Sequence, residues 1–189
     1  MNQGKAIIFS APSGSGKTTI VKELLRKRAD LMFSVSATTR SPRAGETDKK
    51  DYYFLSVSEF KSKIMDDEMV EWEEVYSGTF YGTLQSELDR IWSMGNHVLF
   101  DVDVVGGINL KKILGERALA VFVRIPDLET LEERLKGRKS ETEESIKARL
   151  GKATHELTFE KNFDISIIND DLAKAVRQTE NVVEEFIAG

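Results

Sequence analysis

The sequence predicts an α/β domain in which a mainly parallel β-sheet is flanked by helices. Two observations carry this prediction. Runs of apolar residues without alternation recur along the 189 residues, as is typical of strands covered on both faces. Helical patterns separate several of these runs, and strands that alternate with helices are typical of parallel sheets.

The predicted buried strands are the four apolar runs Ala6–Phe9, Val98–Phe100, Leu119–Ile125 and Ile165–Ile168. The first predicted helix covers Lys17–Arg28. The later helices have an aspartate at the start, a glycine at the end, or both. The aspartate carboxylate caps a first turn, and glycine readily ends a last turn. These later helices are Asn109–Leu114 before Gly115, a helix from Asp127 to Gly137, and a last helix capped by Asp170 or Asp171.

The stretch from about Ser34 to Gly95 breaks this alternation. We interpret it as a lobe inserted between the first helix and the next core strand. Ser56 and Glu59 have the spacing of a capping box, which predicts the start of a helix there. The other predicted elements of the lobe are β-like pieces at Phe33–Ser36, Tyr52–Leu55 and Met69–Val75, and a helix over about Leu84–Met94.

The composition limits the partners that the chain can have. Its 27 lysines and arginines against 32 aspartates and glutamates give a net charge of −5, which disfavours nucleic acid and anionic membranes. It has no cysteine, so disulfides and thiolate chemistry are excluded. No signal-peptide layout and no apolar run of about 20 residues is present. We expect a cytoplasmic protein with small-molecule partners, whose oligomeric state the sequence leaves open.

The segment Ser10–Thr19 is glycine-rich and stands between a predicted strand and a predicted helix. In this context the backbone N–H groups of such a turn can cradle phosphate oxygens, aided by the helix dipole. Lys17 can then reach the β- and γ-phosphates, and the Thr18 hydroxyl can bind Mg²⁺. Ala11 stands where the usual pattern has its first glycine. The alternative, an ordinary glycine and serine turn, is disfavoured by the flanking elements.

Asp101 and Asp103 follow the apolar run Val98–Phe100. They should therefore lie at the carboxyl edge of the sheet, where open α/β folds bind ligands. There Asp101 could act near Mg²⁺ through water, because Mg²⁺ keeps much of its hydration shell. The alternative is an acidic turn at the end of a strand.

Arg40 and Arg43 flank Pro42, which favours extended or polyproline geometry in the residue before it. A period of three would place both guanidinium groups on one side, where they suit a dianionic phosphate. Tyr52 and Tyr81 could add hydroxyl donors to the same phosphate. Taken alone, the arginines fit a solvated basic loop at least as well.

Glu71 follows an apolar pair and precedes Trp72. A glutamate in this setting is usually a surface carboxylate. If it is buried, however, it is purely an acceptor, and guanine offers adjacent N–H donors where adenine does not. A pocket of this kind discriminates strongly, because the wrong base leaves buried groups unpaired.

A second insert, from Arg134 to about Leu157, is strongly charged and helical, and Ser140 with Glu143 gives another capping-box pattern. One interpretation is a mobile lid that carries arginines onto a transferring phosphoryl group. The other is a solvated surface on which the arginines pair with neighbouring glutamates. The arginines are Arg134, Arg138 and Arg149.

Taken together, these motifs resemble the guanylate kinase family, and the resemblance runs nearly from end to end. The segments that carry it are Ser10–Thr19, Phe33–Phe54, Glu71-Trp72, Ser77–Thr83, Asp101-Val102-Asp103, Arg134–Arg138, Glu141–Arg149 and Ile168-Asn169-Asp170. The resemblance implies transfer of the γ-phosphoryl group of ATP to GMP with Mg²⁺, in purine nucleotide metabolism and GMP recycling. It also implies a P-loop NTPase-like nucleotide-binding core (1–33, 97–125 and 158–189), a mixed α/β GMP-binding lobe (34–96) and a helical lid (126–157).

The resemblance further implies roles for individual residues. The catalytic residues would be Lys17, Arg134, Arg138 and Arg149, and Mg²⁺ would be held by Thr18 with phosphate oxygens and by Asp101 through water. ATP would be bound by Ala11, Pro12, Ser13, Gly14, Ser15, Gly16, Lys17, Thr18, Thr19 and Asn169. GMP would be bound by Ser36, Arg40, Arg43, Tyr52, Glu71, Tyr81, Gly82, Thr83, Asp101 and Asp103.

The sequence departs from the family pattern at few positions. The family also accepts alanine at the position of Ala11. Lys139 and Ser140 stand where the lid usually reads Gly-Thr, and Thr158–Phe163 replaces a tyrosine-rich approach to the last strand. Two other functions are alternatives. An inactive scaffold that binds phosphopeptides is disfavoured by the intact Lys17 and Thr18, and a kinase for AMP, UMP or dTMP is disfavoured by Glu71 with its predicted partners.

Overall fold

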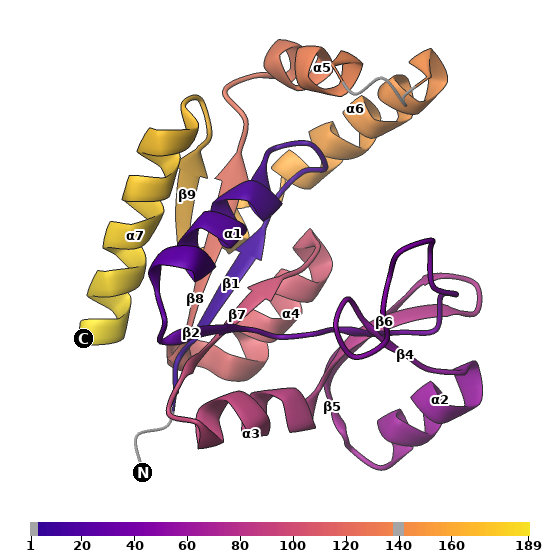
Figure 1. The fold of residues 1–189 in the computed structure, drawn as a ribbon. Coiled ribbons are helices and arrows are strands. Elements are labelled where there is room, and N and C mark those ends of the chain that lie inside the picture. The colour runs from indigo at the N-terminus through magenta and orange to yellow at the C-terminus, as the bar shows by residue number, and fades with distance from the viewer. Residues whose placement is uncertain (1–3, 138–141) are drawn as a thin grey trace.

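A computed structural model describes residues 4–137 and 142–189. Its centre is a five-stranded sheet in which every neighbouring pair is parallel (Figure 1), as the sequence predicts. Because helices cover both faces, its strands are largely apolar, and most of their polar residues stand at the strand ends. In spatial order they are β2 (Leu31–Phe33), β7 (His97–Asp101), β1 (Ala6–Ser10), β8 (Ala118–Arg124) and β9 (Ile165–Ile168).

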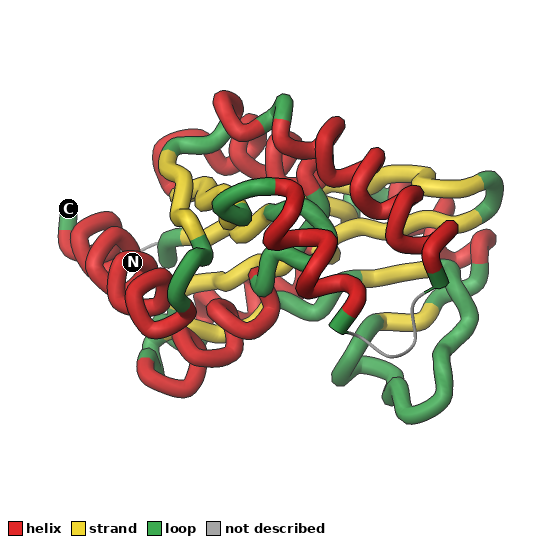
Figure 2. Tube along the Cα trace, turned by 90° about the horizontal axis from the view of Figure 1, so that it is seen from above, coloured by secondary structure: helices red, strands yellow, loops and turns green. Residues whose placement is uncertain are grey.

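Successive residues of β1 point to opposite faces of the sheet and belong to two separate cores. On one side Ile7 and Phe9 pack with α1 (Lys17–Lys27) and α7 (Leu172–Ala188). On the other side Ala6 and Ile8 pack with α3 (Gln85–Ser93) and α4 (Val104–Leu114). The view from above shows the strands between these helical layers (Figure 2). The strand ends are thereby held rigidly where loops leave the sheet.

A second, four-stranded sheet forms the inserted lobe. It combines parallel and antiparallel pairs around a small core of Ala37, Phe60, Phe80 and Leu84. The capping box at Ser56 and Glu59 is present and begins α2 (Val57–Met65). The strands, in spatial order, are β4 (Tyr53–Phe54), β3 (Ala37–Thr38), β6 (Thr79–Leu84) and β5 (Met69–Tyr76).

Two helices, α5 (Leu128–Lys136) and α6 (Glu143–Leu157), pack on each other above the central sheet (Figure 1). Asp127 caps α5 as expected. The predicted capping box at the start of α6 is wrong, because α6 is capped by Thr142, whose side chain accepts the N–H of Ser145. Ser140 itself lies outside the described residues. Two short 3₁₀ turns, Gly115–Arg117 and Glu160–Asn162, complete the elements that the structure describes.

Two other predictions need correction, and one strand was missed. Phe33–Ser36 is not one strand, because Leu31–Phe33 is an edge of the central sheet and Ala37–Thr38 belongs to the lobe. The strand Thr79–Leu84 was not predicted, and α4 begins at Val104 rather than Asn109. In the described parts of the chain no helix is long and apolar enough to cross a membrane.

Gly107 explains why α4 runs through a glycine pair that normally discourages a helix. A Cβ atom on Gly107 would lie 2.3 Å from the Ser10 Oγ. Glycine therefore permits a close approach between α4 and the end of β1 at a modest cost in helix propensity. This contact places the start of α4 beside the glycine-rich loop.

Candidate active site

The glycine-rich loop connects β1 to α1 and surrounds a cavity of about 400 Å³, here called the loop cavity. Gly14 and Gly16 have φ of +97° and +88°, which L side chains rarely adopt, so these two glycines allow the backbone to curl. Gly16 is also the N-cap of α1, which directs the positive end of that helix toward the cavity. The cavity is lined by residues 11–19, Asp101, Val102, Asp103, Lys152 and Glu156.

Lys17 and Thr18 meet the end of β7 inside the loop cavity. The Lys17 ammonium lies 2.6 Å from the Asp101 carboxylate and also donates to the Val102 carbonyl. The Thr18 hydroxyl donates to the second Asp101 oxygen at 3.0 Å. The three groups predicted to meet a phosphate and its metal ion thus lie together at one strand end. Among the described residues, this site included, no three His, Asp or Glu side chains gather to hold a metal ion.

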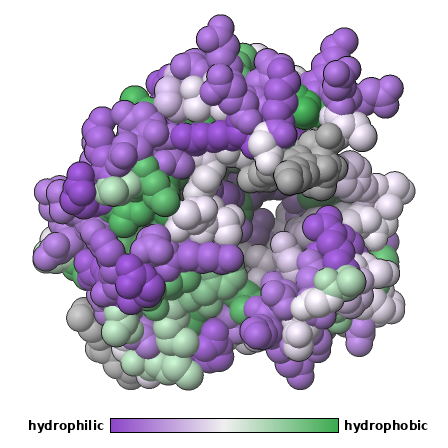
Figure 3. All heavy atoms as spheres, turned by 45° about the horizontal axis from the view of Figure 1, so that its top comes forward, coloured by the Kyte–Doolittle hydropathy of each residue, from purple (hydrophilic) through white to green (hydrophobic). Residues whose placement is uncertain are grey.

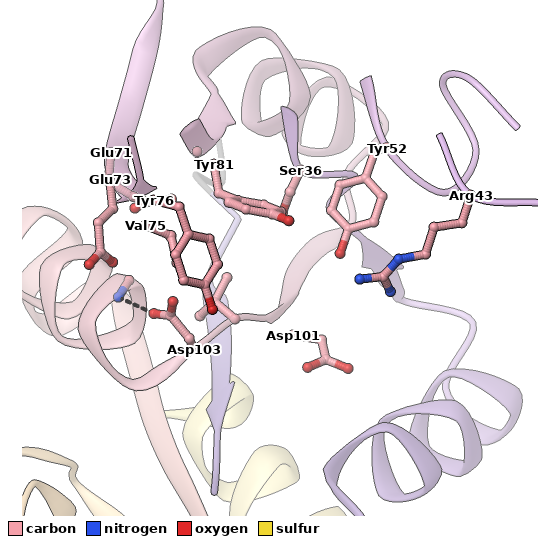
Figure 4. A pocket seen from close by; sticks show the side chains of 13 residues that line it. Ser36, Arg43, Tyr52, Glu71, Glu73, Val75, Tyr76, Tyr81, Asp101 and Asp103 are labelled. Carbon is pink, nitrogen blue, oxygen red and sulfur yellow. Dashed lines mark hydrogen bonds between the residues drawn. The ribbon is translucent and has the colours of Figure 1, made fainter. Parts of the chain in front are cut away.

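A second cavity of about 340 Å³, here called the lobe cavity, opens between the four-stranded sheet and the start of α4 (Figure 4). It shares Asp101, Val102 and Asp103 with the loop cavity. The space-filling view shows a largely hydrophilic face that is hollowed on one side (Figure 3), as suits polar ligands. The other lining residues are Ser36, Arg43, Tyr52, Glu71, Glu73, Val75, Tyr76, Tyr81, Gly82 and Gly106.

Glu71 is buried on β5 and accepts a hydrogen bond from the Thr83 hydroxyl on β6 at 2.9 Å. The two residues are register partners in the antiparallel sheet, so the pair is set by strand pairing. Burial raises the pKa of Glu71 to about 7, an effect that Thr83 opposes and that the nearby Asp103 and Glu73 charges reinforce. Gly82 permits the packing, because a Cβ there would lie 2.6 Å from the Glu71 carbonyl oxygen.

Arg40 and Arg43 differ in what they contact. The Arg40 guanidinium forms a two-pronged ion pair with Glu46, with both bonds at 2.9 Å, and also donates to the Tyr81 hydroxyl at 3.2 Å. Arg43 donates its backbone N–H to the same Glu46, while its side chain lines the lobe cavity together with Tyr52. The structure therefore brings both arginines to one loop, but only Arg43 lines the cavity.

Asp103 has a structural role beside its place in the cavity wall. Its carboxylate caps α4 by accepting the N–H of Gly106 at 2.8 Å (Figure 4), and its carbonyl accepts the Ser10 hydroxyl. These bonds fix the segment 101–103 as a rigid wall between the two cavities. Sequence reasoning placed both acids at the strand end but did not identify Asp103 as a helix cap.

The predicted lid arginines lie at different positions relative to the glycine-rich loop. Arg149 of α6 donates to the Ser13 hydroxyl at 2.8 Å, at the rim of the loop cavity. Arg134 of α5 lies behind the loop instead, where it donates to the carbonyl oxygens of Ser15 and Asn169. Asn169 is buried and donates to the Ser15 carbonyl. Arg138 lies outside the described residues.

Four lining residues with polar side chains were missed by the sequence reasoning. Glu73 and Tyr76 of β5 belong to the lobe cavity, and Lys152 and Glu156 of α6 belong to the loop cavity. The alternation along β5 could have linked Glu73 to Glu71, because residues two apart face the same side of a strand. The helical spacing of Glu156 from Arg149 could likewise have placed both on one face of α6.

Comparisons with known sequences and structures find relatives along nearly the whole chain. The family model described as guanylate kinase matches residues 3–186. A guanylate kinase of Bacteroides fragilis is 49% identical over 98% of this chain and 91% of its own length. The crystal structure of guanylate kinase from Anaplasma phagocytophilum is 27% identical, covers 100% of this chain and 89% of that one, and has a TM-score of 0.79. A shikimate kinase from Bacteroides thetaiotaomicron, 13% identical with a TM-score of 0.54 over 95% of this chain and 98% of its own, shares the fold.

Proposed function

The chain belongs to the guanylate kinase family, and we propose that the two cavities hold the two substrates of one reaction. The enzyme is an ATP:GMP phosphotransferase that moves the γ-phosphoryl group of ATP to GMP and gives ADP and GDP. ATP occupies the loop cavity through residues 11–19, and GMP occupies the lobe cavity. Their shared wall, 101–103, lies where the phosphoryl group crosses.

The observation that supports this assignment best is the buried pair of Glu71 and Thr83 in the lobe cavity. An ionised carboxylate accepts the adjacent N–H donors of guanine, whereas adenine offers no such pair. The Thr83 hydroxyl and the Ser36 side chain are polar partners for the rest of the base edge. Binding the wrong base would leave the Glu71 carboxylate buried without donors, which gives strong discrimination.

The GMP phosphate is held at the opposite end of the lobe cavity. Arg43, Tyr52 and Tyr81 line that end and offer N–H and O–H donors. Arg40 joins them when it exchanges Glu46 for the phosphate, which costs little because one anionic partner replaces another. The phosphate oxygen that attacks is already ionised, so the reaction needs no general base.

Catalysis then depends on positioning and on charge stabilisation of the moving phosphoryl group. Lys17 supplies a positive charge from the loop, and Arg149 supplies another from α6. Arg134 must turn away from the carbonyl oxygens of Ser15 and Asn169 to do the same, and we retain it and Arg138 as candidates. Asn169 stays a candidate for contacts near the adenine.

The residues present fit a magnesium ion. The Thr18 hydroxyl and the Asp101 carboxylate are hard oxygen ligands that lie 3.0 Å apart at the mouth of the loop cavity. We propose that Thr18, with phosphate oxygens, and Asp101, through water, hold Mg²⁺. When bound, the ion would neutralise charge on the phosphates and orient them.

We further propose that the chain works as three units. These are the nucleotide-binding core (1–33, 97–125 and 158–189), the GMP-binding lobe (34–96) and the lid (126–157). The separate small cores of the lobe and of α5 with α6 support this division. The cytoplasm is the proposed compartment, because both nucleotide substrates are available there.

The test is formation of ADP from ATP with GMP, dGMP, AMP, UMP and dTMP measured side by side. We expect turnover with GMP that exceeds turnover with AMP by at least two orders of magnitude, as expected for a pocket that hydrogen-bonds its substrate. Activity with AMP equal to that with GMP would overturn the assignment of the lobe cavity.

A further inference from the structure

Helix α6 contacts the phosphate-binding loop at Ser13. The Arg149 guanidinium donates to the Ser13 hydroxyl at 2.8 Å. Glu156 is seven residues further along, so its side chain lies on the same face of α6, two turns away. It lines the loop cavity together with Ser13. Two side chains of one helix face thus flank the same loop residue.

Burying the Glu156 carboxylate at this position costs free energy. It is only 8% exposed, and its Oε2 has no hydrogen-bond partner among the residues that the structure describes. Its Oε1 lies 3.6 Å from the ammonium of Lys152, whose side chain is 61% exposed. Burial raises the pKa of Glu156, and the Lys152 ammonium and the Ser13 N–H lower it. A glutamine or leucine would fill the same space without burying a charge.

The surroundings limit what this carboxylate can do. An anion cannot bind the phosphates of ATP, because like charges repel. The groups that favour its charge are the Ser13 N–H of the loop and the Lys152 ammonium of its own helix. Glu156 is therefore suited to hold the loop backbone rather than a substrate.

We propose that Glu156 is a positioning residue that fixes α6 on the phosphate-binding loop, so that the Arg149 guanidinium stays within reach of the transferred phosphoryl group. This inference rests on the proposed function. With the helix fixed two turns away, Arg149 needs only a side-chain movement to exchange the Ser13 hydroxyl for a phosphoryl oxygen. Because Arg149 is already in place, less free energy is spent on moving it when the transition state forms.

The experiment is a double-mutant cycle with Glu156→Ala and Arg149→Ala, measured as kcat and KM for GMP. We expect Glu156→Ala to lower kcat about tenfold, with KM changed by less than about twofold, because the lost contact serves the transition state. In the Arg149→Ala background the same change should lower kcat by less than about twofold. Glu156→Gln keeps an acceptor oxygen beside the Ser13 N–H and should keep most of the activity.

Glu144→Ala, an exposed glutamate on the same helix, is the matched control and should leave kcat unchanged. Should Glu156→Ala fail to fold in a thermal melt, Glu156→Leu replaces it and fills the space without an acceptor. An equal loss of kcat with and without Arg149 would overturn the inference, and so would an unchanged kcat in Glu156→Ala.

A second readout separates this inference from the proposed function. Wild-type protein that forms no ADP with GMP would contradict the function alone. The contact with the loop is then tested by hydrogen exchange of the Ser13 amide. We expect faster exchange in Glu156→Ala than in Glu156→Gln or the wild type. Equal exchange in all three would overturn the contact.

Discussion

The two cavities handle charge in opposite ways. In the loop cavity the Lys17 ammonium is neutralised by Asp101 at 2.6 Å, on two side chains that are about one-sixth exposed. In the lobe cavity the Glu71 carboxylate is buried with a neutral hydroxyl as its partner, and it forms no ion pair with any described residue. The first site can exchange one ionic partner for another. The second holds a charge whose proper partners arrive with the substrate.

The difference in charge indicates how each cavity selects its ligand. A phosphate competes with Asp101 for Lys17, and any nucleotide carries that phosphate. A base that fits the lobe cavity must instead supply neutral N–H donors to Glu71, which is a stricter requirement. Under the proposed function, base specificity therefore belongs to the lobe cavity and phosphoryl transfer to the loop cavity.

The largest expected effect is the loss of kcat when Lys17 of the loop cavity is substituted. Lys17→Met keeps much of the side-chain volume and removes the charge, so kcat should fall by about a thousandfold or more, as for loss of a main electrostatic contact to a transition state. KM for GMP should change little, because Lys17 does not line the lobe cavity. A coupled assay of ADP formation checks this, with circular dichroism as the control for folding. Near-normal turnover would contradict the role of the loop.

The second effect is a rise in KM for GMP when Glu71 of the lobe cavity is substituted. Glu71→Ala should raise KM for GMP about a hundredfold, equivalent to about 3 kcal/mol, since hydrogen bonds to a charged group are lost. KM for ATP should stay within about threefold, because Glu71 does not line the loop cavity. Initial rates with each substrate varied in turn measure both constants. Equal changes in the two would show that Glu71 does not read the base.

A third prediction concerns the free protein. Glu71 has its pKa raised from 4.5 to about 7, so between these values the unfolded chain ionises first and stability falls as pH rises. Glu71→Gln removes this loss and should stabilise the free protein at pH 8 by up to about 3 kcal/mol, and by close to nothing at about pH 4.5. Urea unfolding at both values measures the difference. Equal shifts at the two would point to packing rather than charge.

The smallest expected effect is the pH dependence of GMP affinity. Under the proposed function GMP binding needs ionised Glu71, so affinity should rise as pH increases through about 7 and be about tenfold weaker one unit below. Thr83→Val removes the hydrogen bond that lowers the Glu71 pKa, so its midpoint should move to higher pH. Calorimetric titration with GMP gives both midpoints. Ionisation of the GMP phosphate, near pH 6 for phosphate esters, is common to both proteins and does not affect their difference.

The central sheet and the loop could be predicted because their signals are local. Apolar runs mark β1, β7, β8 and β9, and the glycine-rich turn stands between a strand and a helix. The short strand β2 and the lobe strand β6 were missed, since three residues or a glycine-containing segment carry little periodicity and gain their structure from pairing.

The candidate site was predicted by residue type rather than by contact. The sequence indicated Arg40 and Glu71, but the ion pair with Glu46 and the bond to Thr83 depend on how distant segments meet. Arg134 was predicted to be a lid residue, yet it donates to the carbonyl oxygens of Ser15 and Asn169. The spacing of Glu156 from Arg149 could place both on one face of α6, but nothing in the sequence indicated that Glu156 is buried at the loop cavity.

The common wall at 101–103 also has a consequence for inhibitor design. A compound that joins an ATP-like half to a GMP-like half would meet both cavities across only these three residues. A short tether that passes the wall makes the second binding event intramolecular, and its effective concentration reaches the millimolar range. Such a compound would gain affinity from its span rather than from new contacts, and a tether too short to cross Asp101 would lose the whole gain.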